Sequence, residues 1–453
     1  MRPKPQDRDA FDLFQSHFDQ LLNPEHVLVQ LAKKIDWSRF ETALASCYTQ
    51  DMGAPAKATR LMVGLQYLKY TFNESDESVV ARWVENPYWQ YFCGFTHMQH
   101  EVPLDPSSMS RWRKRVGEQR LELLLQETID LAVREKHVSK GELERVNVDT
   151  TVQEKNITFP TDSKLLYKAI EKLGDAAKSR DIPLRQSYVR VGKRAAVKAG
   201  RYAHAKQYKR MRRCLRKLRT YVGRLIRDIR RKASELDPEL ATLLDRAERI
   251  RQQPPHDTHK LYSLHEPEVQ CISKGKAHKR YEFGQKVAIA TTNRGNWTVA
   301  AKLLPGNPYD GHTLAETLTT IERITRVTVT DAYVDKGYRG HGCTGAANVR
   351  VAGQSRGNTT RSERKRRRRR SAVEPKIGHL KSDHRMNRCY LTGLEGDAIN
   401  ALLAAAGSNL RKLLRRLAAA LIRWLRIVIE TGSITLEMTP NFAGPASMIR
   451  LCA

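Results

Sequence analysis

The sequence predicts a mixed α/β protein, and three observations lead to this fold class. Apolar residues recur at helical spacing through the first 135 or so residues, which indicates a series of short helices. Runs of β-branched residues begin near residue 145 and return after residue 255, which indicates strands. A basic block of helical character, residues 162–256, separates the two groups of strands. At 453 residues, the chain is long enough for two or three folded units.

The charge of the chain indicates its class of partner. Lys and Arg number 80 against 49 Asp and Glu, which leaves a formal charge of +31 at pH 7. Such an excess attracts a polyanion and makes binding salt-dependent through counterion release. Nucleic acid is the leading partner, although an anionic membrane surface or ribosomal RNA would fit the charge alone almost as well. Composition therefore gives the class of partner and not the reaction.

Other features exclude several classes of protein. The first residues contain no apolar stretch of the kind that a secretory signal needs, so we expect a cytoplasmic protein. The most apolar stretch, residues 417–429, is interrupted by Arg423 and Arg426 and is too short to span a bilayer, so we expect no membrane partner. The seven cysteines include no CxxC pair, so neither a zinc site nor a disulfide framework is indicated.

We expect residues 1–140 to form an all-helical region that binds DNA. Ser75 can cap one of its helices, and Asn86 followed by Pro87 can begin another. A later helix opens near residue 105 and carries four candidate DNA-contacting cations, Arg111, Arg113, Lys114 and Arg115. Short helices that end in a basic one suggest a helix-turn-helix-like unit. A helical bundle with a solvated basic face fits the pattern about equally well.

The basic block at 162–256 reads as a helical insertion. Leu218, Val222 and Leu225 fall on one face of a helix, and cations crowd the rest of its surface. Arg213 and Arg216 are candidate DNA contacts, because so many like charges repel one another unless an anion is near. The alternative is a solvated helical hairpin that only packs.

The elements outside the insertion follow a recognisable order. A strand around Asp149 precedes further strands, a helix that begins near residue 310, a strand leading into Asp335, a short strand, and a helix holding Glu374. Three consecutive antiparallel strands followed by alternating helices and strands, with acidic residues at these places, is the arrangement of a ribonuclease H-like core. We expect this catalytic domain to span residues 141–400 and a C-terminal helical tail to fill residues 401–453.

Asp149, Asp335 and Glu374 are the candidate catalytic and metal-binding residues. When a phosphodiester is attacked in line, two divalent ions activate the attacking oxygen and neutralise the leaving one. Hard ions such as Mg²⁺ need oxygen ligands, and carboxylates supply them. For any one of the three residues, a salt bridge is the more common role. Asp331 and Asp397 could have been chosen by spacing alone.

The sequences around the three carboxylates resemble those of a known family. They read VDTTVQEKNI around Asp149, YVDKGYRG around Asp335, and VEPKIGHLKSDHRMNRCYL around Glu374. These segments closely resemble the three acidic motifs of bacterial insertion-sequence transposases of the IS-five group, a branch of the DDE superfamily. Further blocks, among them VVARWVENPYWQYFCGF and GNPYDGHTL, extend the resemblance over nearly the whole chain.

The resemblance implies roles for individual residues. The family's catalytic Asp, Asp and Glu fall on the three candidates, which would hold two ions of Mg²⁺ or Mn²⁺ per active site. The related IS-four signature places an Arg four positions before the Glu and a Lys seven after it, which here are Arg370 and Lys381. Its leading Tyr is replaced by Arg367 in this chain. We expect Arg370 and Lys381 to hold phosphates near the scissile bond, unless Arg370 only belongs to the general arginine run.

The implied function is that of a DNA transposase of an insertion sequence. It would bind the terminal inverted repeats of the transposon as double-stranded DNA, cleave there, and transfer the freed strand to target DNA, acting near the bacterial nucleoid. Two ends must be joined, so we expect a homodimer on DNA. The alternatives are a related metal-dependent nuclease without strand transfer and an inactive copy that only binds nucleic acid.

Minor candidates lie beside the motifs. Asp310 and His312 could form a pair next to the site, but a turn with a helix cap is the favoured interpretation. His379, Asp383 and His384 follow Glu374 at near-helical spacing and are interpreted as surface or phosphate-contact residues.

Overall fold

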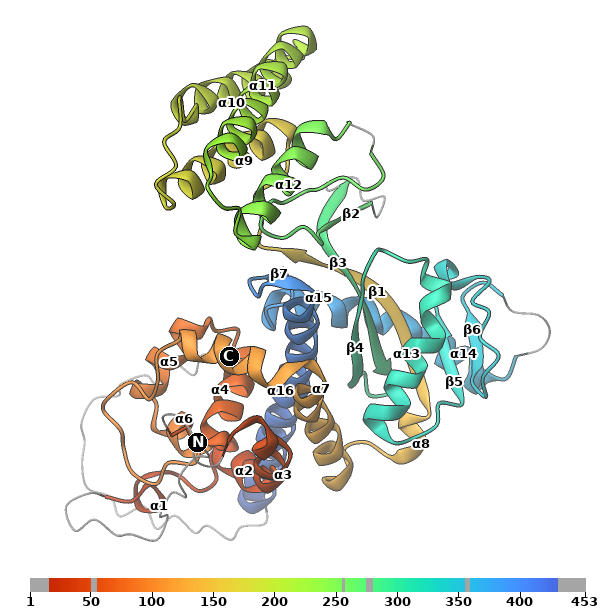
Figure 1. Cartoon of the computed structure of the whole chain (residues 1–453). Helices are drawn as coiled ribbons and strands as arrows, with labels where there is room; N and C mark the ends of the chain where they lie inside the picture. The colour runs from red at the N-terminus through yellow and green to blue at the C-terminus, as the bar shows by residue number, and fades with distance from the viewer. Residues whose placement is uncertain (1–15, 50–54, 255–256, 274–279, 355–358, 431–453) are drawn as a thin grey trace, which may run out of the picture.

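The computed structural model describes residues 16–49, 55–254, 257–273, 280–354 and 359–430. The described chain is a mixed α/β fold in which a twisted sheet lies between a helical N-terminal region and a separate group of helices (Figure 1). Among these residues, no helix combines the length and the apolar character that crossing a bilayer requires.

Helices alone make up the described part of the N-terminal region. They are α1 (Phe18–Leu21), α2 (Val27–Lys34), α3 (Trp37–Leu44), the 3-10 turn η1 (Ala45–Cys47), α4 (Thr59–Thr71), α5 (Asp76–Glu85), α6 (Pro87–Phe92), α7 (Ser107–Arg134) and α8 (Lys140–Leu143). The predicted caps are present: the Ser75 side chain accepts from the amide of Ser78, and Asn86 accepts from the amide of Trp89. Gly117, at φ 76° and ψ 165°, kinks α7 into two segments.

A seven-stranded mixed sheet forms the centre of the molecule. Its strands are β1 (Arg145–Lys155), β2 (Gln270–Ser273), β3 (Tyr281–Thr292), β4 (Thr298–Leu304), β5 (Asp331–Val334), β6 (Asn348–Val351) and β7 (Arg388–Cys389). Strands β1, β3 and β4 pair in antiparallel fashion, whereas β5 pairs parallel to β1 and β6 parallel to β5. Helix α13 (Asp310–Thr325) connects β4 to β5. This order of three antiparallel strands, a helix and two parallel strands agrees with the predicted order and is consistent with a ribonuclease H-like core.

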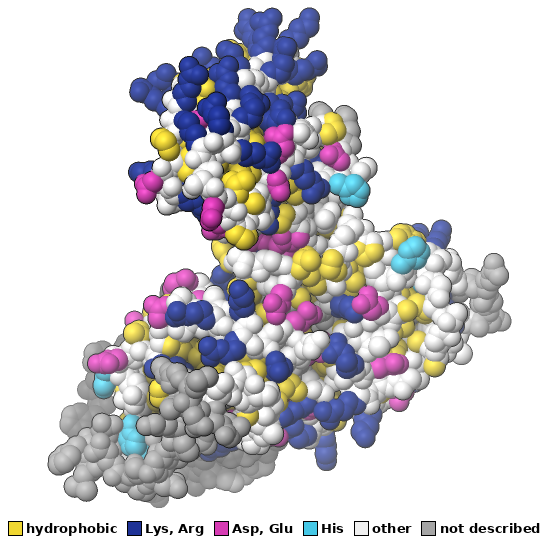
Figure 2. Space-filling model, viewed as in Figure 1, with side chains coloured by type: hydrophobic (Ala, Val, Ile, Leu, Met, Phe, Trp, Pro, Cys, Tyr) yellow, Lys and Arg dark blue, Asp and Glu magenta, His cyan; other side chains and the backbone are white. Residues whose placement is uncertain are grey.

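The insertion is a helical unit with its own apolar core. Helices α9 (Asp162–Lys178), α10 (Val189–His204), α11 (Tyr208–Lys232) and α12 (Pro238–Gln252) lie between β1 and β2. The predicted apolar face of α11, with Leu218, Val222 and Leu225, is buried against residues such as Ile170 and Leu244. The four helices project from the sheet (Figure 1) and carry a dense group of Lys and Arg side chains on their surface (Figure 2).

The C-terminal helix α16 (Gly393–Glu430) lies between the N-terminal helices and the sheet (Figure 1). Its Asn400 accepts a hydrogen bond from the Tyr70 hydroxyl of α4 and donates one to Gln153 of β1. Gly407 lies so close to α4 that an added Cβ would meet the Tyr70 backbone at 2.6 Å. The predicted boundary between residues 400 and 401 therefore falls inside one helix. Residues 401–414 of this helix are buried or half-buried and belong to the folded body, whereas residues 431–453 lie outside the described residues.

A buried ion cluster stabilises the N-terminal region and changes the interpretation of one residue. The Arg113 guanidinium is 2% exposed and donates to Asp76, with its Nη2 at 2.6 Å from Oδ2. Lys69 contacts the other Asp76 oxygen at 2.8 Å. Burial favours a higher pKa for Asp76, but the hydrogen bond from Arg113 and the charge of Lys69 outweigh it and lower this pKa to about 2. Arg113 therefore serves the fold, which corrects its expected role as a DNA contact.

Replacing Asp76 tests this cluster. We expect Asp76→Asn to lower the free energy of unfolding by about 3–5 kcal/mol, because two cations would remain buried without a counter-charge. Since the folded-state pKa lies below the usual 3.8, the stabilisation from Asp76 should be present above pH 4 and be lost as the pH falls toward 2. Chemical denaturation as a function of pH measures both effects.

Asp245→Asn is the matched control, because Asp245 forms an exposed ion pair with Arg230. It should change the stability by less than about 0.5 kcal/mol. Equal effects of the two substitutions would contradict a structural role for the Asp76 cluster.

Candidate active site

Two of the three predicted carboxylates lie side by side at one edge of the sheet. Strand β1 pairs parallel to β5 with Val148 opposite Val334; Asp149 is the next residue of β1, and Asp335 directly follows the last residue of β5. Neighbouring strands lie about 4.8 Å apart, so this register brings the two side chains to adjacent positions. One Asp149 oxygen accepts from the amide of Thr150 at 2.7 Å. The carboxyl ends of parallel strands are where α/β proteins commonly bind ligands.

The third carboxylate is brought to this edge by a helix. The basic helix α14 (Arg361–Arg369) leads through the 3-10 turn η3 (Arg370–Ala372) into α15 (Val373–Asp383), whose second residue is Glu374. The Asp335 and Glu374 side chains are 52% and 64% exposed, and the Arg370 guanidinium lies between them. Its Nη1 is 3.7 Å from Asp335 and its Nη2 is 3.8 Å from Glu374. Glu374 is thus connected to the aspartate pair through a cation.

Buried asparagines hold this helical segment against the sheet. Asn293, in the turn directly after β3, donates to the carbonyl oxygen of Arg366 at 2.9 Å and to the Asn147 side chain of β1 at 2.7 Å. Asn147 in turn donates to the carbonyl oxygen of Arg369 at 3.2 Å. These carbonyls belong to the last turn of α14, where no intrahelical partner is available. Two neighbouring strands therefore fix the position from which Arg370 and Glu374 extend.

The environment of Tyr338 shows that the aspartate pair fits a hard cation. Tyr338 belongs to the 3-10 turn η2 (Lys336–Tyr338), is 1% exposed, and its hydroxyl lacks a hydrogen-bond partner among the described residues. Burial first, and then the negative charges of Asp310, Asp149 and Asp335, raise the pKa of this phenol. Clustered carboxylate oxygens beside an unused hydroxyl donor suit a hydrated Mg²⁺ or Mn²⁺ ion.

The described side chains are not yet gathered into a complete metal site. No three His, Cys, Asp or Glu residues in the described parts of the chain lie close enough together to hold an ion. The Arg370 guanidinium lies between Asp335 and Glu374 and separates these two carboxylates.

Asp310 has a different environment from the one expected. The N-cap of α13 is Tyr309, which makes no side-chain cap, and Asp310 is the first residue of the helix. The Asp310 Oδ1 atom accepts from the Thr150 hydroxyl and from the Lys286 ammonium group, each at 3.1 Å. The expectation of a turn with a side-chain helix cap is therefore wrong, and Asp310 lies beside the aspartate pair. In the sequence, the feature that could have indicated a role for Asp310 at the site is its place in the block GNPYDGHTL, which is part of the family resemblance.

The remaining acidic and histidine candidates have structural or surface roles. Asp397 is buried and pairs with Lys155 at 3.0 Å, whereas Asp331 lies 3.7 Å from both Arg145 and Arg350. His384 is buried and contacts the Tyr70 carbonyl oxygen, and burial lowers its pKa to about 4. His379 Nδ1 makes a hydrogen bond with Asp383 at 3.0 Å on the surface of α15.

A cationic pocket adjoins the carboxylates. Its volume is about 530 Å³, and it lies at the ends of β5 and β6 between the sheet and α14. Four arginines line it, Arg350, Arg367, Arg368 and Arg370. Arg367 also donates to Glu363 at 3.1 Å. An anion placed in this pocket would lie next to Arg370 and within reach of Asp335.

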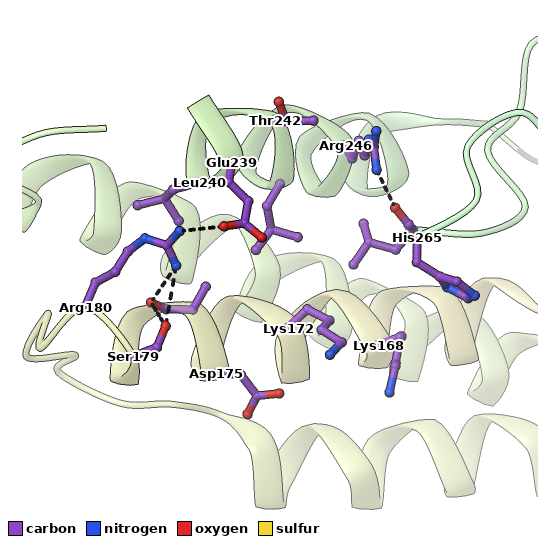
Figure 3. Close-up of a pocket in the computed structure, with 13 residues that line it drawn as sticks. Lys168, Lys172, Asp175, Ser179, Arg180, Glu239, Leu240, Thr242, Arg246 and His265 are labelled. Carbon is purple, nitrogen blue, oxygen red and sulfur yellow. Dashed lines mark hydrogen bonds and ion pairs between the residues drawn. The ribbon is translucent and has the colours of Figure 1, made fainter. Parts of the chain in front are cut away.

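A second cavity of about 580 Å³ lies within the insertion, between α9 and α12 (Figure 3). Several of its polar side chains bond to one another or to the backbone: Arg180 donates to Glu239 and Ser179, and Arg246 donates to the Leu264 carbonyl oxygen. The cavity therefore belongs to the packing of the helices and not to the carboxylate site.

The structure places the other predicted cations in three regions. Arg111, Lys114 and Arg115 are exposed on the first segment of α7. Arg213 and Arg216 are exposed on α11, and Lys381 is half-buried on α15.

The asparagine contacts generate a test of how Glu374 is positioned. In Asn293→Ala, the Arg366 carbonyl and the Asn147 side chain lose a buried donor, which should cost about 1–3 kcal/mol. We expect faster hydrogen exchange in residues 361–374, measured by mass spectrometry, while exchange in α11 is unchanged. Asn348→Ala, at an exposed position on β6, is the control and should leave both segments unchanged. Normal protection of residues 361–374 in Asn293→Ala would show that these contacts do not hold the helix.

Comparisons with known proteins identify the family. Residues 16–115 match the transposase domain DUF772, and residues 258–410, which include Asp335 and Glu374, match the transposase DDE domain. The chain is also 53% identical over 208 residues to an uncharacterized protein of Rhizobium meliloti, ORF8 in the nfe locus, and this match covers 46% of the chain and all of that protein. No solved structure matches. Asp149 lies between the two matched domains and is joined to the second by the pairing of β1 with β3 and β5. The chain therefore belongs to the DDE transposases, enzymes that act on DNA.

Proposed function

We propose that this transposase binds the terminal inverted repeats of an insertion sequence of the IS-five group, cleaves DNA there, and transfers the freed strand to target DNA. Asp149, Asp335 and Glu374 are its catalytic carboxylates on a ribonuclease H-like core. The observation that carries the proposal is the parallel register of β1 and β5, which makes Asp149 and Asp335 neighbours. The contact of one Arg370 guanidinium with both Asp335 and Glu374 supports the inclusion of the third residue.

The three carboxylates would hold two ions of Mg²⁺ or Mn²⁺. When bound, such ions activate the attacking oxygen and neutralise the leaving one. Asp149, which lies within β1 just beyond its pairing with β5 and accepts from the Thr150 amide, orients one side of the site. Asp335, next to Asp149 through the strand register and next to Glu374 through Arg370, would hold the ions together with these two residues. The reaction needs no covalent bond to the protein, because water and then the freed 3′-hydroxyl are the attacking groups.

The cationic pocket beside the carboxylates supplies the contacts to the DNA backbone. A phosphate bound there would attract Arg370 away from Asp335 and Glu374, because a guanidinium binds a phosphate in bidentate fashion. Lys381, seven residues after Glu374, would hold a neighbouring phosphate. Binding of DNA would thereby free Glu374 to join Asp149 and Asp335, so that the full set of three carboxylates forms only on the substrate.

The remaining DNA surface is divided between two helical regions. We assign the terminal repeat to the exposed cations of the N-terminal region, Arg111, Lys114 and Arg115, and further backbone contacts to Arg213 and Arg216 of the insertion. Two transposon ends have to be held for joining, so the active assembly is a homodimer on DNA.

Neutralising each carboxylate in turn tests the catalytic assignment. Asp149→Asn, Asp335→Asn and Glu374→Gln should each reduce cleavage and strand transfer by at least about 10³-fold, because these residues act as one unit. Glu316→Gln is the control, since Glu316 is an exposed residue of α13 paired with Lys302. The assay incubates purified protein with DNA carrying the inverted repeats and with target plasmid, in Mg²⁺ or Mn²⁺.

The same assay separates the alternative functions. Hydrolysis without joined products would favour a metal-dependent nuclease. Unchanged transposition in cells by Asp149→Asn would contradict the catalytic role and favour an inactive copy that only binds nucleic acid.

The assignment of the insertion is tested by the salt dependence of DNA binding. Removing two phosphate contacts with Arg213→Ala and Arg216→Ala together should reduce the slope of log affinity against log salt by about 1.8. Arg323→Gln with Arg326→Gln removes the same charge from the last turn of α13 and from the residue that follows it, and should leave the slope nearly unchanged. Equal slopes for the two double variants, measured by fluorescence anisotropy, would show that the insertion does not contact the backbone.

A further inference from the structure

A fourth acidic side chain, Asp310, lies at the same edge of the sheet as Asp149 and Asp335. It reaches this edge from α13, an element separate from the strands of the other two aspartates. We propose that Asp310 is a fourth carboxylate of the cation site, contributing its negative charge to the ion held by Asp149 and Asp335. This inference rests on the proposed function, because it adds a ligand to the same site.

The two oxygens of Asp310 have different partners. Oδ1 accepts from Thr150, the residue after Asp149, and from Lys286 of β3, whose ammonium group also donates to the Pro308 carbonyl oxygen. Oδ2 faces the turn that follows Asp335, because a Cβ added at Gly337 would lie 3.4 Å from it. Asp310 is thus fixed by one oxygen on the Asp149 side and directs the other toward the Asp335 side.

The chain around Asp310 is fixed against the same turn. The Tyr309 hydroxyl donates to the Arg339 carbonyl oxygen at 2.8 Å. Gly311 is needed for this arrangement, since a Cβ there would meet the Tyr309 ring at 2.8 Å and the His341 backbone at 3.3 Å. The start of α13 is therefore held on the η2 turn independently of the Asp310 side chain.

The Tyr338 hydroxyl points independently to a ligand at this place. It is a buried donor without a described partner, and the charges that act on it include Asp310, Asp149 and Asp335. A buried hydroxyl left unpaired costs free energy, so its surroundings are expected to contain a group that accepts its hydrogen bond. A water molecule on a cation held by the three aspartates would meet that need. In that arrangement, Asp310 provides charge that Asp149 and Asp335 alone do not.

Two substitutions distinguish the charge of Asp310 from its hydrogen bond. Asp310→Asn removes the charge and keeps the shape, whereas Thr150→Val removes the hydrogen bond to Oδ1 and keeps the charge. Binding of Mn²⁺ to the full chain is measured by isothermal titration calorimetry, and cleavage of inverted-repeat DNA is measured in parallel. Glu316→Gln, on the same helix, controls for the loss of one negative charge, and Asp149→Asn serves as the reference for a lost ligand.

We expect Asp310→Asn to weaken the binding of Mn²⁺ by about 10- to 100-fold, with Thr150→Val within threefold of the wild type. The melting temperature of Asp310→Asn should match that of Glu316→Gln. The proposal is overturned if Asp310→Asn binds Mn²⁺ within twofold of Glu316→Gln, or if Thr150→Val weakens binding as much as Asp310→Asn. Failure of the proposed function gives a different result, namely Mn²⁺ binding and cleavage that are insensitive to Asp149→Asn.

Discussion

The parallel pairing of β1 with β5 is the constraint on which the site depends. Asp149 and Asp335 are separated in the sequence by the insertion and by the strands β2, β3 and β4, and the parallel register makes them neighbours. A shift of one residue would turn one of the two side chains to the opposite face of the sheet. The register is held from both directions, since β3 pairs with β1 along its length and β6 pairs with the far side of β5.

Buried hydrogen bonds fix the surrounding helices relative to the sheet. Asn147 and Asn293 fix α14, from which Glu374 follows, while Asn400 joins α4 to β1 through Tyr70 and Gln153. Asn409 of α16 donates to Thr298 of β4 and to Thr128 of α7. Each of these hydrogen bonds contributes little to the free energy of folding, but a buried amide without its partners lowers the stability considerably. The elements therefore keep one relative placement.

The sequence predicted the features that depend on local patterns. The helical N-terminal region, the basic insertion and the order of strands around Asp149 and Asp335 follow from periodicity and turn chemistry, and they agree with the structure. Long-range contacts were beyond such patterns. The pairing of Arg113 with Asp76, the place of α16 inside the core, and the bond from Thr150 to Asp310 join residues at least 37 positions apart. A sequence pattern does not distinguish a polar helix residue that faces solvent from one that faces a buried partner. For this reason the sequence predicted a DNA contact for Arg113 and a helix cap for Asp310.

The length and burial of α16 have a consequence for where the enzyme would cut. The helix has 38 residues, which corresponds to about 57 Å at 1.5 Å per residue, and it contacts both the N-terminal helices and β4. A rigid connection of this kind leaves no freedom for one region to slide along DNA relative to the other. If the N-terminal helices hold the repeat as proposed, the number of base pairs between the recognised sequence and the broken bond is set by the protein itself.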